Sequence, residues 1–105
     1  MRLAWVMTVT LVAMVPAAVA AYQLDGNQLF EICSGQHQIC TGYVMGVADA
    51  RDRDTHGIAF CIPDGVSKAQ LQEVVVTYLR NSPKRNFPAA ILVSGALAEK
   101  FQCPN

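Results

Sequence analysis

Apolar residues form one long run at the start of the chain and afterwards recur at helical spacing. The run covers residues 3–15, follows Arg2, and is succeeded by Ala-Val-Ala at residues 18–20. A basic start, an apolar stretch and a small-x-small site are together typical of a secretory signal peptide. We therefore expect residues 1–20 to be cleaved, so that the mature chain begins at Ala21. An uncleaved membrane anchor is the alternative, but the run is shorter than the ~20 apolar residues that a spanning helix needs.

Two helices are expected in the first half of the mature chain. The first covers residues 25–33, with Asp25 as its N-cap. Its core-facing positions are Leu29, Phe30 and Cys33. The second runs from about residue 38 to residue 53, and its predicted core stripe consists of Tyr43, Val47 and Ala50. On its outer side, Asp49 precedes Arg53 by four residues, a spacing that predicts an exposed ion pair.

Small residues also recur on the second expected helix. Gly42, Gly46 and Ala50 follow one another every four residues. Two glycines inside a helix cost about 1 kcal/mol each relative to alanine, which favours a packing reason for them. Because small residues let another backbone come close, we expect this stripe to lie at a helix crossing. Replacing Gly46 by alanine would then destabilise the fold.

A loop and a third helix are expected next. Residues 54–66 carry two glycines and a proline, which predicts a structured loop with an extended stretch over residues 58–62. The third helix should follow it, since Ser67 and Gln70 have the spacing of a capping box. The apolar positions of this helix share one face and are Leu71, Val74, Val75, Tyr78 and Leu79. Asn-Ser-Pro at residues 81–83 should end it.

A fourth helix is expected near the C-terminus, with Asn86 as its cap and Pro88 in its first turn, where a missing amide does no harm. One predicted apolar face consists of Phe87, Ala90, Ile91, Leu97, Ala98 and Phe101. Further apolar residues off this face are Leu92, Val93 and Ala96. A helix that is apolar nearly all round is usually the central helix of its bundle.

Composition limits the class of protein. The 105 residues allow one small domain, which we place at residues 21–105. Without Arg2 the chain has seven basic and eight acidic residues and no run of like charge, so nothing favours nucleic acid or an anionic lipid surface as a partner. We expect an all-α fold, a small disulfide-stabilised four-helix domain that follows a signal peptide, because so small a core benefits from cross-links.

The four cysteines of the exported part are expected to form two disulfides. A simple up-down bundle favours Cys33–Cys40 together with Cys61–Cys103. If the loop after the second helix runs back along that helix, Cys61 instead reaches Cys40, and Cys33 pairs with Cys103. The sequence does not decide between these pairings, and a third pairing is also open.

Candidate catalytic and metal chemistry is weak in this sequence. A cysteine nucleophile assisted by His37 or His56 conflicts with an even number of exported cysteines. Zinc ligation by Cys33, His37 and Cys40 conflicts with the absence of a C-x-x-C pair. Asp49 and Asp52 lie among arginines, as a solvated charged face does. We therefore expect a protein that is not an enzyme and has no cofactor.

One ordered set of residues extends over nearly the whole mature chain. It consists of Cys33, Cys40-x-Gly42-Tyr43-x-x-Gly46-x-x-Asp49-Ala50, Phe60-Cys61-Ile62-Pro63-x-Gly65-Val66, Val74-Val75-x-x-Tyr78-Leu79, Pro83, Pro88-Ala89-Ala90, Leu92-Val93, Ala96-Leu97 and Phe101-Gln102-Cys103. In this order the set resembles the Rap/Tai family, whose members include immunity proteins of type VI secretion systems. The matching residues are those that build the fold, and no motif for partner recognition is among them.

The resemblance implies a periplasmic protein that binds and inhibits a peptidoglycan amidase effector, and it is compatible with a homodimer. A periplasmic stress or chaperone-like protein without an effector is the alternative. For partner binding we select the charged loop residues Arg51, Arg53, His56 and Asp64. Loops on rigid scaffolds commonly carry recognition, and the cysteine at position 61 would hold this one firm.

Overall fold

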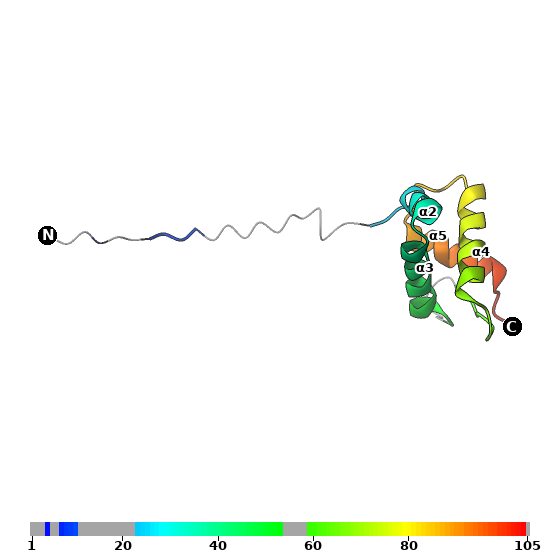
Figure 1. The fold of residues 1–105 in the computed structure, drawn as a ribbon. Coiled ribbons are helices and arrows are strands. Elements are labelled where there is room, and N and C mark those ends of the chain that lie inside the picture. The colour runs from blue at the N-terminus through cyan, green and yellow to red at the C-terminus, as the bar shows by residue number, and fades with distance from the viewer. Residues whose placement is uncertain (1–3, 5–6, 11–22, 54–58, 105) are drawn as a thin grey trace.

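A computed structural model describes residues 4, 7–10, 23–53 and 59–104 of the chain (Figure 1). Its four helices are α2 (Gly26–Gly35), α3 (His37–Arg51), α4 (Lys68–Asn81) and α5 (Ala89–Lys100). Each of them packs against the other three, and the described ranges contain isolated β-bridges instead of strands. The expectation of an all-α four-helix domain is confirmed. None of the helices in the described part is long and apolar enough to cross a membrane, and the predicted cleavage site at residues 18–20 lies outside the described residues.

Two of the helices begin with reciprocal side-chain caps. The Asp25 carboxylate accepts the Gln28 backbone N–H at 2.8 Å, and the Gln28 side chain accepts the Asp25 N–H at 2.9 Å. Ser67 and Gln70 form the same arrangement at the start of α4, with distances of 3.1 and 2.8 Å. Each box satisfies backbone donors that a helix start otherwise leaves without partners. The predicted caps at Asp25 and Ser67 are therefore confirmed.

The C-terminal end of α3 differs from the prediction. This helix ends at Arg51, and Arg53 has a left-handed φ of 62°. The Asp52 carboxylate lies 3.6 Å from the Arg53 guanidinium and also accepts the Ile62 N–H at 3.0 Å. The expected ion pair between Asp49 and Arg53 was wrong, because the chain leaves the helix before the i, i+4 spacing is completed.

The start of α5 also differs. Pro88, and not Asn86, occupies the N-cap position, and no side chain caps this helix. The Pro88 carbonyl accepts the Ile91 and Leu92 N–H groups at 3.1 and 3.2 Å. The Ala89 N–H donates to the Leu24 carbonyl at 2.7 Å, so tertiary contact with the segment before α2 fixes where the helix begins.

The core lies between the inner faces of the four helices. The predicted face of α4 is confirmed, with Leu71, Val75 and Leu79 buried. On α3 the buried positions are Cys40, Val44 and Ala48. The predicted stripe of Tyr43, Val47 and Ala50 was wrong by about one position: the first two are half-buried and Ala50 is exposed. The buried stripe begins at Cys40, which is bonded to Cys33 and which the predicted stripe did not include.

The helix α5 is the most deeply buried. Six of its twelve residues are buried, and the Ser94 hydroxyl among them donates to the Ala90 carbonyl at 2.8 Å. The central position expected of an apolar helix is consistent with this burial. The expected face was only partly right: Leu97 is buried, and Ala98 and Phe101 pack against the core as expected. Leu92, Val93 and Ala96 are buried, whereas Phe87 and Ile91 are exposed.

The glycine stripe of α3 faces solvent. A Cβ atom at Gly42 or Gly46 would have no heavy atom within 4 Å, and Ala50 is exposed. The expectation that these residues lie at a helix crossing was therefore wrong. The i, i+4 spacing shows that they share a face, but it does not say which face of the helix is covered.

Replacing Gly46 by alanine should therefore stabilise the protein, by about 0.5–1 kcal/mol, because alanine loses less backbone entropy in a helix and meets nothing here. Urea unfolding of the mature protein measures the change. Gly42→Ala, on the same open face, should give a gain of similar size. A loss of stability in both variants would contradict a solvent-facing stripe.

Two disulfides tie the bundle. Cys33–Cys40 joins the end of α2 to the start of α3 across seven positions, and Cys61–Cys103 joins the segment before α4 to the C-terminal segment across 42. This is the pairing expected of an up-down bundle. A backbone hydrogen bond of 2.8 Å from the Cys61 N–H to the Phe101 carbonyl lies beside the longer link.

Candidate functional site

The predicted partner-binding residues lie at the C-terminal end of α3 and in the segment before α4. Arg51, Arg53 and Asp64 are exposed, and His56 lies outside the described residues. The Arg53 N–H donates to the Phe60 carbonyl at 2.9 Å, while the Asp52 carboxylate holds Ile62 as described above. Arg51 and Arg53 therefore lie together at one corner of the molecule, where α3 ends.

The Cys61–Cys103 disulfide connects the segment that follows this corner to the C-terminal segment. Cys61 joins the segment to Cys103, and the Gly65 backbone, with a φ of 89°, provides the turn after Asp64. Glycine adopts that conformation at no steric cost. Three of the four predicted side chains therefore lie on or beside backbone that main-chain hydrogen bonds and a disulfide connect to the bundle.

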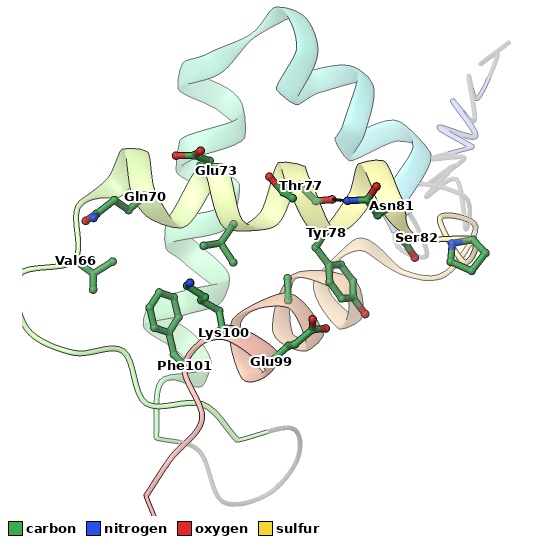
Figure 2. A pocket seen from close by; sticks show the side chains of 13 residues that line it. Val66, Gln70, Glu73, Thr77, Tyr78, Asn81, Ser82, Glu99, Lys100 and Phe101 are labelled. Carbon is green, nitrogen blue, oxygen red and sulfur yellow. Dashed lines mark hydrogen bonds between the residues drawn. The ribbon is translucent and has the colours of Figure 1, made fainter.

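A groove that the sequence reasoning missed lies between α4 and α5. It encloses about 800 Å³ and has apolar walls from Val74, Tyr78 and Phe101. Figure 2 shows Glu73, Glu99 and Lys100 around it. A Cβ atom at Gly95 would lie 3.2 Å from the Tyr78 hydroxyl oxygen, so glycine at this position makes room for the tyrosine. Val74 and Tyr78 belong to the apolar face predicted for α4. The sequence indicates that face, but it does not indicate that these two residues lie at its half-buried edge.

Polar side chains join α3 to α4 beside a second groove, which His37 and Gln72 line. The Thr41 hydroxyl donates to the Gln72 side-chain oxygen, and the Gln72 side-chain nitrogen lies 3.3 Å from His37 Nδ1. The cysteines that would have completed a zinc site with His37 are bonded to each other. The zinc alternative therefore loses its ligands.

The same bonds exclude a cysteine nucleophile, because all four cysteines of the chain are in disulfides. Within the described ranges, no group of three or more His, Cys, Asp or Glu residues is placed to hold a metal ion. On α3, burial raises the pKa of the Tyr43 phenol above 10.0, because the charged form would lose hydration. This phenol therefore stays neutral at physiological pH.

Comparison with known protein families decides the kind of protein. A family model described as Rap1a immunity proteins matches residues 25–103. The chain belongs to the Rap1a immunity protein family. The Rap1a match begins at the N-cap of α2 and ends at the last cysteine, so it covers all four helices and both disulfides. Searches of curated proteins and of solved structures find no match. Membership of the Rap1a family implies an immunity-type function against a bacterial effector, which agrees with the resemblance identified in the sequence.

Proposed function

We propose that this protein is exported to the periplasm and protects its cell by binding and inhibiting a peptidoglycan amidase effector of a type VI secretion system. The protein acts without catalysis: it occupies a surface that the effector needs. The observation that carries the proposal is the disulfide-tied bundle in a chain of the Rap1a immunity family.

The disulfides support the compartment. Disulfides persist where thiols are oxidised, as in the bacterial periplasm, and are rare in the cytosol. An amidase that cleaves peptidoglycan meets its substrate in that same compartment. The N-terminal segment, with the pattern of a signal peptide, gives a route to it.

Rigidity supports inhibition by binding. A domain with two cross-links and capped helices loses little conformational entropy when it associates with a partner. We assign part of the effector contact to the corner that carries Arg51, Arg53 and Asp64. His56, which lies outside the described residues, is proposed as a contact from the sequence alone. The exposed charges of the corner would select among effectors, because a mismatched partner would leave them without counter-charges.

The test is co-expression in the periplasm with the amidase encoded beside the gene. The full-length chain should restore growth, and the purified protein should begin at Ala21 and inhibit peptidoglycan cleavage by that amidase in vitro. A chain without residues 1–20 should give no protection, because it stays in the cytosol. Failure of the purified mature protein to bind or inhibit the amidase would overturn the proposed function.

Charge reversal tests the assigned corner in the same assay. Arg51→Glu should weaken amidase binding about tenfold, the usual order for a charged contact at an interface. Arg51→Lys keeps the charge and is the matched control, so it should bind nearly as well as the wild type. Unchanged binding by Arg51→Glu would move the contact away from this corner and leave the inhibitory function standing.

A further inference from the structure

Exposed apolar side chains gather where α5 begins. Across residues 23–53 and 59–104, the exposed large apolar residues are Ile39, Phe87 and Ile91. The last two are 43% and 49% exposed and lie on either side of the Pro88 N-cap. Single exposed apolar residues are common on protein surfaces, whereas contiguous exposed apolar patches with a polar rim mark interaction sites.

One basic side chain lies near a member of this apolar pair, and a second basic residue follows it in the sequence. The Lys84 ammonium lies 5.6 Å from the centre of the Phe87 ring, and the Arg85 guanidinium lies 4.9 Å from the centre of the Phe30 ring. Neither cation forms an ion pair with a carboxylate within the described part of the chain. We call Lys84, Arg85, Phe87 and Ile91 the connector patch, because they lie in or beside the connection between α4 and α5.

The charge balance around the connector patch is positive. Residues 82–88 contain two basic residues and no acidic residue, and the last turn of α4 adds Arg80. One adjoining carboxylate is that of Asp25, which lies opposite Pro88 in a β-bridge and caps α2 by accepting the Gln28 N–H. An acidic partner surface is therefore the one that complements this end of the molecule.

Main-chain hydrogen bonds hold the connector in one conformation. The Gly26 N–H donates to the Phe87 carbonyl at 3.0 Å, and the Asn27 N–H donates to the Arg85 carbonyl at 2.9 Å. Within the connector, the Phe87 N–H donates to the Lys84 carbonyl at 3.0 Å. The side chains of the connector patch are thus presented by ordered backbone, which lowers the entropy lost on binding.

We infer that the connector patch is a docking surface for the effector, and that the effector meets it with an apolar pocket rimmed by acidic side chains. Phe87 and Ile91 enter the pocket, and Lys84 lies against the acidic rim. Aromatic and arginine side chains in the centre of an interface carry most of its affinity, and surrounding charges raise the rate of association. This inference rests on the proposed function and adds a second contact: in Figure 1 the connector between α4 and α5 lies at the opposite end of the bundle from the C-terminal end of α3.

The experiment measures the affinity of the mature, oxidised protein for the amidase encoded beside its gene. Phe87→Ser and Lys84→Glu should each raise the dissociation constant about tenfold or more. Lys84→Glu should also flatten the dependence of the association rate on salt, because the steering charge is lost. Ile39→Ser and Lys68→Glu are the controls: the first replaces an exposed apolar side chain on α3 by serine, and the second makes the same charge reversal at the far end of α4. They should alter affinity less than twofold, and circular dichroism should show that all four variants are folded.

The outcomes separate the two claims. If the wild type binds and both connector variants bind equally well, the connector patch is not a docking surface and the proposed function stands. If the wild type itself does not bind the amidase, the proposed function and this inference both fall. Equal weakening by the connector variants and their controls would also overturn the inference, because the effect would not belong to this patch.

Discussion

Replacing Cys61 and Cys103 together by alanine should lower the free energy of unfolding by roughly 4 kcal/mol. The link closes a stretch of 42 positions, and the chain-entropy model gives a loop of that length about this contribution. For a domain this small, such a loss is a large part of the whole stability. Urea unfolding of the oxidised protein measures it.

The local effect of the same variant should be equally visible. Without the disulfide, the main-chain contact between these two segments is the hydrogen bond from residue 61 to the Phe101 carbonyl. Limited proteolysis should therefore cut the C-terminal segment of the variant faster than that of the wild type. An unchanged unfolding midpoint together with unchanged proteolysis would show that the bundle does not depend on this link.

Replacing Gly26 by alanine should destabilise the fold by about 2–3 kcal/mol, the upper part of the range for overpacking. A Cβ atom there would overlap the Leu92 side chain and would lie 2.7 Å from the Arg85 carbonyl oxygen and 3.1 Å from the Arg85 Cα. The leucine could change its rotamer, but the Arg85 backbone is tied to the next residue of α2 by a hydrogen bond. The backbones must therefore separate.

Gly46→Ala is the matched control for that experiment, because the same added methyl group should have the opposite sign on open helix surface. The comparison uses thermal and urea unfolding of both variants under one set of conditions. If Gly26→Ala were as stable as the wild type, the close crossing between the start of α2 and the connector would not exist in solution.

These two glycines show what sequence reasoning could and could not predict. Features that depend on residues close in the sequence could be predicted. The Ser67–Gln70 box, which starts α4, and the apolar face of α4 are such features, and both are confirmed. The role of a glycine depends on what lies opposite it, which is a tertiary fact. Gly26 carried no periodic signal, whereas Gly46 carried one that pointed to the wrong face.

The face of α5 could not be predicted for a related reason. A helix with apolar residues on nearly every side gives no periodic preference, so Leu92 and Ile91 could not be sorted into core and surface. Assigning Phe87 to the core also hid the connector patch. The available signal was the Lys-Arg pair at residues 84 and 85, just before an aromatic residue that no helical period required to be buried. The disulfide pairing could not be predicted either, because it depends on the path that the chain takes after α3.

The connector is held by peptide N–H and carbonyl groups, which every residue except proline possesses in full. The backbone conformation of the connector is therefore largely independent of the side chains at positions 84 and 87. During the divergence of effectors and their antagonists, substitutions at these positions could alter partner preference without a second change to restore the fold. Gly26, which packs against the Arg85 backbone, cannot be replaced in this way. The connector thus combines a fixed frame with replaceable contact residues, as the antigen-binding loops of antibodies do on their own scaffold.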